Sequence, residues 1–399
     1  MALELNKLTS SVDALGANAA RRLADLNERF LPAAQEMLKT IRADDDDLQK
    51  KIKAARKHRW AGAIPTDEPV DAVFATPPHP TRANIIAADG SQIYPDRHGI
   101  ALYFLINIGS IIFRHGLDEA PGTSSTPQVF YEDDEMYYAE ESSPINGEMV
   151  NAMRDARELG ELARLAEAEA QTAPTVTLLD NGLLMYISLR EQNRKFSDEI
   201  IETYLSHLDT LRASGAAPAG VVDRPRAANV VRLLNLATME LNEIGPDTLR
   251  GVGPFHGVTD AMVFGFLRPG ERSAVFVNAS PDNDLYYEPG GHTIYFFYLN
   301  AGRPGKDALL RIEVPQWIAT DKTKLDLVHA AIVEQCRVSD GFPYVLMRAH
   351  ELAVVTVNER REFEQMVIGS LIRRGLTPGI SQKAQGKQWT GTGKKRYPK

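Results

Sequence analysis

The segment ANIIAADGS, residues 83–91, marks an abrupt change from a helical pattern to a strand pattern. It is a short apolar run that ends in Asp89-Gly90-Ser91, and such a run predicts a buried strand. Gly90 allows the backbone to turn sharply behind Asp89, so we expect this carboxylate at the strand end, facing a cleft. An Asp-Gly pair after a strand is also the sequence of a plain turn, and that alternative stays open.

The segments that follow predict the fold class. ALYFLINIGSIIFRHG (101–116) and PQVFYED (127–133) have the aromatic and β-branched content of strands, which suggests an antiparallel meander. After them we expect a helix, a strand, a helix, a strand and a helix, at residues 146–170, 175–180, 199–214, 219–222 and 227–237. This order predicts an α/β, RNase H-like fold with a mixed five-stranded sheet flanked by helices.

The second half of the chain elaborates that fold. Strands are expected at 273–278, 292–300 and 309–319, then a helix near 324–338 and a last long helix that opens at His350 and runs to about Leu371. The aromatic run Tyr295 to Tyr298 offers rings for stacking bases, but its alternation along a strand favours a core face.

The flanking segments differ in composition from this main domain. Residues 1–62 read as an N-terminal helical arm, broken near Asp44 to Asp47, and the prolines within 63–82 indicate a linker. The main domain spans 83–372. Residues 373–399 form a basic, flexible tail that adds salt-sensitive DNA affinity or merely solubilises the chain.

Composition places the chain among globular proteins. Of its 399 residues 43% are hydrophobic and 25% are charged. It has neither a signal-like start nor an apolar stretch long enough for a membrane helix, so we expect a cytoplasmic protein without a membrane partner. The single cysteine, Cys336, cannot form an internal disulfide, and we expect a buried thiol.

The net charge of −8, from 45 basic and 53 acidic residues, disfavours a nucleic-acid partner when taken alone. Its distribution matters more, because acidic residues concentrate at 44–47 and 132–141 whereas the last residues are basic. A protein that uses carboxylates as metal ligands can be acidic overall and still hold DNA locally.

Acidic residues after two strands suggest a metal site. Asp180 follows TVTLL as Asp89 follows IIAA, and paired carboxylates are what Mn²⁺ or Mg²⁺ prefers. A helical glutamate completes such a set. Glu161 is our choice because it is nearer Asp180 in sequence, with Glu158 the alternative, although either fits a solvated helix face equally well.

Three kinds of residue have less support from sequence. His350 follows a turn and can assist at a phosphate, but a lone histidine is more often structural. Arg224 and Arg226 flank a strand end, where they meet a DNA phosphate or pair with Asp223. Tyr344, in the turn before His350, is a further candidate for DNA binding.

An ordered set of short motifs resembles the NurA nucleases over about residues 83 to 368. The motifs are AADGS at Asp89, LLDNG at Asp180, VVDRPR at Asp223, GERSAVF at Gly270, RIEVPQWIA at Arg311 and GFPYVLMRAHELAVV at Gly341. The chain departs from the family pattern where Asn181-Gly182 follows the second aspartate and where Phe342 replaces a tyrosine. Tyr344 is near enough in sequence to supply the missing hydroxyl.

The resemblance implies an RNase H-like nuclease that uses Mn²⁺, with Mg²⁺ possible, to cleave single-stranded DNA and resect duplex ends. It implies a homodimer that docks on a hexameric HerA-type ATPase, in double-strand break repair or phage defence. Asp89 and Asp180 match the family's metal-binding aspartates, Glu161 or Glu158 its helical glutamate, and His350 its late histidine.

We therefore expect two-metal phosphodiester hydrolysis with cations held by Asp89, Asp180 and the helical glutamate. Two alternatives remain at this point. The protein is a non-catalytic DNA-end clamp for the ATPase, or an enzyme of the same chemistry that acts on RNA or a hybrid.

Overall fold

The computed structural model describes residues 5–376, except 97–98, 100, 139–142 and 186–192. The chain forms two compact units. Unit 1 contains residues 1–80, 180–184 and 217–344, and unit 2 contains residues 81–179, 185–216 and 345–399. Each unit is described by itself. Most of the expected basic tail, residues 377–399, lies outside the described residues.

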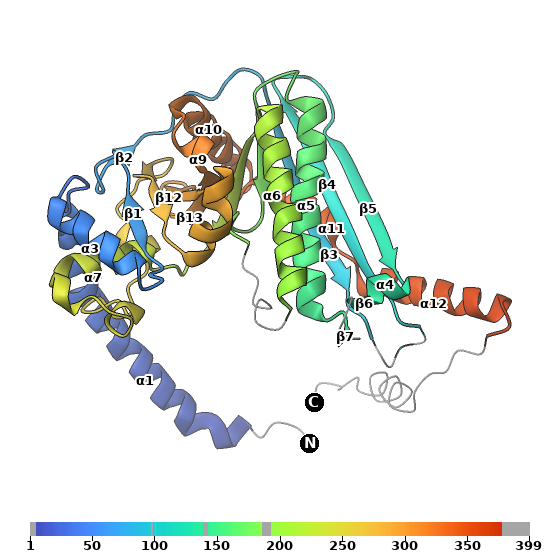
Figure 1. The fold of residues 1–399 in the computed structure, drawn as a ribbon, viewed down its shortest axis with the longest axis horizontal. Helices are drawn as coiled ribbons and strands as arrows, with labels where there is room; N and C mark the ends of the chain where they lie inside the picture. The colour runs from blue at the N-terminus through green and yellow to red at the C-terminus, as the bar shows by residue number, and fades with distance from the viewer. Residues whose placement is uncertain (1–4, 97–98, 100, 139–142, 186–192, 377–399) are drawn as a thin grey trace. The chain divides into compact units, whose positions relative to one another are not determined.

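Unit 2 is built on the strands β3 (Ala83–Ile93), β4 (Phe104–His115), β5 (Gly122–Phe130) and β8 (Thr175–Leu179). The first three run antiparallel in the order β3, β4, β5, and β8 pairs in parallel with the other edge of β3. Helices α5 (Gly147–Glu169) and α6 (Arg194–Ser214) lie side by side, and α5 packs on β3, β4 and β8 (Figure 1). The predicted mixed sheet flanked by helices is confirmed.

Strand β3 does not end at Asp89, and in this detail the sequence prediction was wrong. The strand continues to Ile93 because each residue from Asp89 onward keeps a partner on β4, from Asp89 opposite Gly109 to Ile93 opposite Leu105. Its other neighbour, β8, stops opposite Ala88. Pairing with β4 alone holds Gly90 in extended backbone. Asp89 is the first residue of β3 beyond the end of β8.

The last predicted helix is two helices, α11 (Tyr344–Ala353) and α12 (Val357–Arg373). The side chain of Thr356 accepts a hydrogen bond from the backbone of Glu359 and begins α12, so the single-helix prediction was wrong. Two side chains of the sheet bind the end of α11. Ser91 Oγ donates to the Ala353 carbonyl over 2.6 Å and Asn107 Nδ2 donates to it over 2.8 Å.

Gly109 lets α11 approach the sheet. A Cβ at this position would lie 2.4 Å from the Ala353 nitrogen and 2.6 Å from the Ala349 carbonyl oxygen. Because side chains alternate along a strand, Asp89 and Ser91 point to the face that α11 covers, whereas Ala88 and Gly90 point to the face that α5 covers.

Unit 1 contains the N-terminal helices and a second group of strands. Its sheet runs in the order β1, β11, β12, β13, β9, and β10 pairs with both β12 and β2. The helices are α1 (Thr9–Asp25), α2 (Leu31–Thr40), α3 (Asp46–Arg56), α7 (Asn229–Thr238), α8 (Asp260–Val263), α9 (Gln316–Ala319) and α10 (Lys322–Val338). The strands are β1 (Ala63–Pro65), β2 (Val73–Phe74), β9 (Ala217–Asp223), β10 (Arg272–Ser273), β11 (Phe276–Asn278), β12 (Ile294–Asn300) and β13 (Leu309–Pro315).

The segment expected to be a linker, 63–82, contributes strands to this sheet. β1 pairs with β11 and β2 pairs with β10, each antiparallel. Its prolines concealed these strands, because proline is tolerated at the ends and edges of sheets. The interruption expected near Asp44 to Asp47 between two helices is present, because α2 ends at Thr40 and α3 begins at Asp46. The side chain of Asp45 caps α3.

The core of unit 1 is rich in aromatic rings. Phe296 and Tyr298 are fully buried and pack with Phe264 and Phe276, which is the core face that the alternation predicted. Phe297, on the opposite face of β12, is fully buried as well, so the strand is covered on both faces and not on one. Helices α2, α3 and α7 cover this core through Leu38, Ile52 and other apolar side chains. By contrast α1 has no buried residue, and Val12, Leu15 and Leu23 are exposed along it, as is Leu8 just before it.

The core of unit 1 also contains the buried charged residues Asp260, Arg311 and Glu313. Asp260 accepts a hydrogen bond from the Val231 backbone over 2.9 Å and one from the Tyr298 hydroxyl over 3.0 Å. Arg311 Nε donates to Glu313 Oε1 over 2.9 Å, and its guanidinium lies 3.7 Å from the centre of the Phe296 ring. Burial raises the pKa of Asp260 and raises that of Tyr298 well above its usual range.

His329 on α10 gives unit 1 a pH dependence. Its Nε2 lies 2.9 Å from the Gly270 carbonyl oxygen, and burial lowers the pKa of the imidazole to about 4. An unfolded histidine has a pKa of about 6.5, so between these values the unfolded chain binds more protons than the folded one. Folding stability is therefore lost as the pH falls from about 6.5 toward 4.

We expect His329→Gln to remove this loss, because glutamine still offers an N–H to the Gly270 carbonyl but does not titrate. The measurement is urea unfolding at pH 7 and pH 4.5. The wild type should lose about 2 kcal/mol more than the variant between these pH values. Equal losses would show that His329 protonates as readily in the fold as outside it.

Two smaller expectations concern burial and membranes. Cys336 is buried, as predicted, and burial raises the pKa of its thiol to about 12. Among the described residues, no helix has the length and hydrophobicity needed to cross a bilayer.

Candidate active site

Asp89 and His350 form the centre of the candidate site in unit 2. His350 Nδ1 lies 2.7 Å from Asp89 Oδ2, and the other carboxylate oxygen accepts the backbone N–H of Gly90 over 2.8 Å. An ionised carboxylate only accepts hydrogen bonds, so Nδ1 must carry the proton. In the neutral ring Nε2 is then an acceptor. The His350 side chain is 63% exposed and that of Asp89 only 16%, so the pair presents its imidazole to solvent.

Helix α5 brings further carboxylates to the same part of β3. A Cβ on Gly90 would lie 2.6 Å from Glu158 Oε1 and 2.6 Å from Arg154 Cγ. Only glycine therefore lets these two side chains lie on the strand. Arg154 Nη2 donates to Asp155 Oδ1 over 2.6 Å, and Arg154 Nε lies 3.1 Å from Glu158 Oε1.

The charges of this cluster influence one another. Burial raises the pKa of Asp155, and the negative charge of Asp89 raises it further, against the lowering effect of Arg154. Burial alone would lower the pKa of Arg154, but Glu158, Asp155 and Asp89 together raise it. Asp89 thus shares one electrostatic environment with two α5 residues that the sequence reading missed, Arg154 and Asp155.

The two candidate glutamates have different surroundings. Glu158 is almost fully buried and approaches β3 at Gly90. Glu161 instead accepts a hydrogen bond from Ser110 Oγ on β4 over 2.9 Å and forms an ion pair with Arg164 over 2.8 Å. The structure therefore brings Glu158, rather than the preferred Glu161, to the residue next to Asp89.

Asp180 follows the last residue of β8 in the chain. Leu179 is the parallel partner of Ala88, and Asp180 and Asp89 are the residues that follow these two in the sequence. In unit 1 the residues after Asp180 are well anchored. The Leu184 N–H donates to Glu313 Oε2 over 3.3 Å, and the Tyr287 hydroxyl donates to the Leu183 carbonyl over 3.2 Å.

The remaining predicted residues lie in unit 1. Arg224 has a positive φ of 45° and its Nε lies 3.6 Å from Asp223 Oδ2, so the pairing alternative is present. Arg226 is exposed, and Tyr344 is half-buried at the start of α11. None of these contacts identifies a DNA-binding role.

The side chains around Asp89 have the right chemistry for a divalent cation. Carboxylate oxygens are the ligands that Mn²⁺ and Mg²⁺ favour, and here the cluster already attracts a cationic group, the Arg154 guanidinium. Among the described residues, no three Asp, Glu, His or Cys side chains are already gathered as a metal-binding group. The oxygen donors of Asp89, Asp155 and Glu158 suit such an ion by their chemistry.

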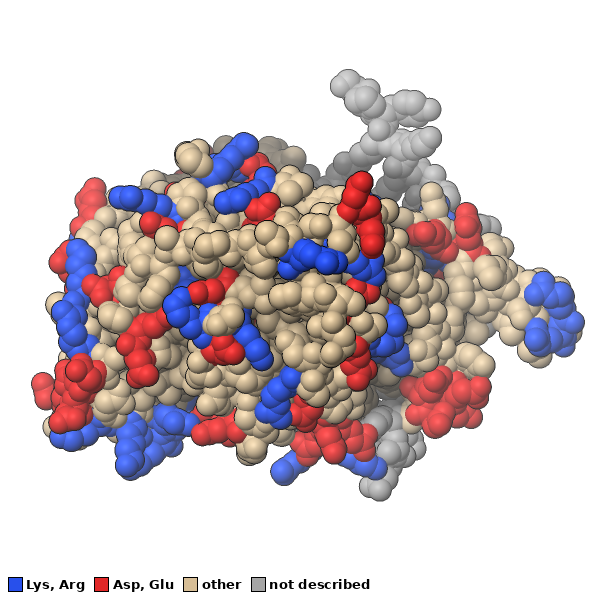
Figure 2. Space-filling model, turned by 90° about the horizontal axis from the view of Figure 1, so that it is seen from above, with Lys and Arg blue, Asp and Glu red and all other residues tan. Residues whose placement is uncertain are grey.

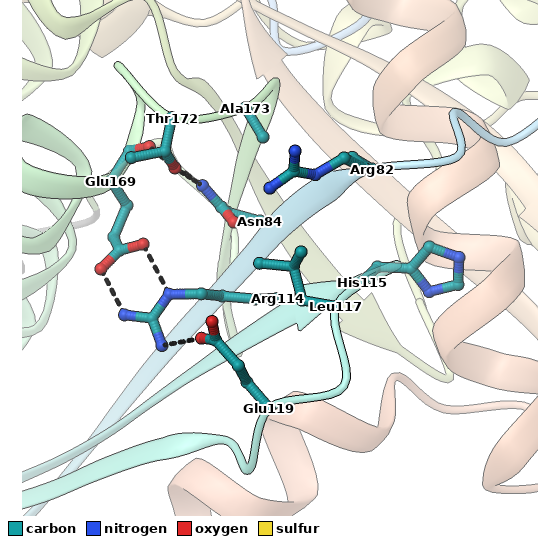
Figure 3. Close-up of a pocket in the computed structure, with 9 residues that line it drawn as sticks. All are labelled: Arg82, Asn84, Arg114, His115, Leu117, Glu119, Glu169, Thr172 and Ala173. Atoms are coloured by element: carbon teal, nitrogen blue, oxygen red, sulfur yellow. Dashed lines mark hydrogen bonds and ion pairs between the residues drawn. The ribbon is translucent and has the colours of Figure 1, made fainter.

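A separate pocket of about 470 Å³ lies in unit 2 near the start of β3 (Figure 3). Arg82, Arg114 and His115 line it. Arg114 makes two hydrogen bonds to Glu169, of 2.9 and 2.5 Å, and lies 3.8 Å from Glu119. Because Glu169 and Glu119 balance much of its positive charge, this pocket lacks the carboxylate excess that distinguishes the surroundings of Asp89.

The surface carries mixed charge. On the face in Figure 2, acidic and basic side chains of the described residues are interspersed. Contact with a polyanion on this face would depend on local cations, in line with the net charge of −8.

Three solved structures are similar to this chain. The NurA nuclease from Sulfolobus solfataricus is 14% identical, with 90% of this chain and 98% of that chain covered and a TM-score of 0.49. The catalytic domain of human Endonuclease V is 14% identical, with 80% and 96% covered and a TM-score of 0.31. Endonuclease V of Ciona intestinalis, solved with a 24mer DNA that contains an inosine, is 12% identical, with 81% and 100% covered and a TM-score of 0.29.

No curated protein matches the chain. The family described as NurA domain matches residues 83–355, which include Asp89, Glu158, Asp180 and His350. That match spans well over half of the sequence, and it agrees with the resemblance found from the short motifs. The chain therefore belongs to the NurA family of nucleases.

Proposed function

We propose that this protein is a metal-dependent deoxyribonuclease that cleaves single-stranded DNA internally and resects duplex ends. The observation that carries the proposal is the Asp89–His350 pair, with its 2.7 Å contact, and the approach of Glu158 to the neighbouring Gly90. Membership of the NurA family supports the same reaction.

The metal ligands in this proposal are Asp89, Asp180 and one glutamate of α5. Glu158 is favoured because it approaches Gly90, and Glu161 remains the alternative. Asp180 joins the set on sequence grounds, as the residue after the partner of Ala88. When bound, Mn²⁺ or Mg²⁺ would supply Lewis-acid stabilisation of the phosphate and activation of water.

The chain's own groups orient the reaction. Asp89 holds the Nδ1–H of His350, which fixes the tautomer and the direction of the ring. His350 Nε2 is then able to accept a proton from the attacking water. The Gly90 N–H donates a hydrogen bond to the second carboxylate oxygen of Asp89, and this contact keeps the carboxylate in place.

We expect Glu158→Gln to reduce DNA cleavage by about a hundredfold or more, whereas Glu161→Gln reduces it less than about fivefold. The reason is that Glu158 approaches β3 at Gly90, the residue next to Asp89, whereas Glu161 is bound to Ser110 on β4. The measurement is the initial rate on labelled single-stranded DNA with Mn²⁺. A stronger effect of Glu161→Gln would restore the choice made from the sequence.

The test of the function itself is cleavage of end-labelled single-stranded and duplex DNA by the purified chain. Mn²⁺, Mg²⁺ and EDTA are compared, and an RNA of matched sequence competes in parallel. The proposal predicts metal-dependent loss of DNA that EDTA stops and that RNA does not displace. Degradation that persists in EDTA, or preferential loss of RNA, would contradict it.

Partners belong to the same proposal. The exposed apolar residues Val12, Leu15 and Leu23 of α1, together with Leu8 just before it, follow helical spacing, and they support burial against a second copy in a homodimer. The hexameric HerA-type ATPase, and a role in double-strand break repair or phage defence, rest on family membership.

A further inference from the structure

Arg154 occupies the position among the α5 carboxylates that a bound cation would compete for. Its Nε lies 3.1 Å from Glu158 Oε1 and 3.2 Å from Asp155 Oδ1, and its Nη2 lies 2.6 Å from the same Asp155 oxygen. Its Nη1 donates to Gln92 Oε1 on β3 over 3.1 Å. One guanidinium thus connects β3 with two carboxylates of α5.

This arrangement is not an ordinary surface ion pair. Only about a quarter of the Arg154 side chain is exposed and Glu158 is almost fully buried, so water screens their attraction weakly. A buried carboxylate requires a positive partner, and Arg154 is the cation that the structure places beside Glu158. A metal ion and the Arg154 guanidinium would therefore compete for the same carboxylate oxygen, Glu158 Oε1.

We infer that Arg154 is a resident counter-ion of the site, which competes with the divalent cation for Glu158 and so weakens metal binding. The inference rests on the proposed function, since it assumes that Glu158 takes part in the metal site. It assigns a role to a residue that the sequence reading missed. Arg154 would act through Glu158, so it is a positioning residue rather than a catalytic one.

Another arginine on the same helix provides a matched control. Arg164 pairs with Glu161 over 2.8 Å, as Arg154 pairs with Glu158, but its side chain is mostly exposed and it contacts neither Gln92 nor Asp155 among the described residues. Neutralising Arg164 removes the same charge from α5 without removing the proposed competitor.

The experiment is a calorimetric titration of the full chain with MnCl₂ in the absence of DNA, which measures metal binding independently of cleavage. We expect Arg154→Gln to bind Mn²⁺ about tenfold more tightly than the wild type, because a positive charge next to the ligand oxygen is removed. Arg164→Gln should change the Kd by less than about twofold, since exposed charges are screened.

Arg154→Lys keeps the charge but lacks the planar guanidinium fork that pairs with both Asp155 and Glu158, so its Kd should fall between those of the wild type and Arg154→Gln. This variant decides the question if Arg154→Gln does not fold. Unchanged or weaker binding in the folded Arg154 variants, with a wild type that binds, would overturn the inference alone. Absence of binding in the wild type and in every variant would overturn it together with the proposed metal site.

Discussion

Replacing Asp89 with asparagine is expected to lower the rate of DNA cleavage by at least about a thousandfold, the equivalent of about 4 kcal/mol of transition-state stabilisation. Asparagine keeps the size of the side chain but removes the charge that would attract a cation. It also replaces the acceptor that holds the Nδ1–H of His350. Both proposed functions of Asp89 are therefore weakened by one substitution.

The measurement is the initial rate on labelled single-stranded DNA with Mn²⁺, together with a thermal unfolding curve for each protein. Asp118→Asn is the control, because it removes the same charge from an exposed residue of unit 2. The control should cleave at the wild-type rate. If folded Asp89→Asn retained more than about a tenth of wild-type activity, Asp89 would not be a metal ligand in this enzyme.

The largest effect on stability is expected from Arg311→Met. Arg311 and Glu313 are each about 95% buried, and removing the cation leaves the Glu313 carboxylate without its partner in the core. Breaking a buried ion pair in this way typically costs about 3–5 kcal/mol. The variant also loses the contact of the guanidinium with the Phe296 ring. Urea unfolding of the purified proteins measures the change.

The double variant Arg311→Met/Glu313→Met provides the test of the cause. If the unpaired carboxylate is responsible, removing it should recover at least about 1 kcal/mol relative to the single variant. No recovery would mean that Arg311 stabilises the core through its packing and its bond to Asn229, rather than through its charge.

The fold was predictable because its signals are local. Three strands, a helix and a further strand follow from short apolar runs and one helical pattern, and the sheet has the predicted mixture of directions. The end of β3 was not predictable, because its continuation beyond Asp89 depends on pairing with β4 and not on the residues of β3 itself. The strands within 63–82 were not predictable either, because the prolines of this segment indicate a linker and the strands form by pairing with β11 and β10.

The candidate site was predictable only in part. Asp89 was found from its place after an apolar run, and His350 from the family motif. The rotation of α5 about its axis decides whether Glu158 or Glu161 approaches β3, and packing on the sheet sets that rotation. Arg154 and Asp155 were missed, although the spacing of Arg154 and Glu158 by four residues places them on one helix face and was visible in the sequence.

Gly90 and Gly109 limit which substitutions the site can accept during evolution. Gly90 admits the side chains of Arg154 and Glu158, and Gly109 admits the backbone of α11, which carries His350. Every single-base change that replaces a glycine codon by that of another amino acid adds a Cβ, and at both positions a Cβ would meet atoms at 2.6 Å or less. A substitution at Gly109 would therefore displace the backbone of α11, and one at Gly90 would displace the side chains of Arg154 and Glu158, so we expect related proteins that keep the activity to retain both glycines.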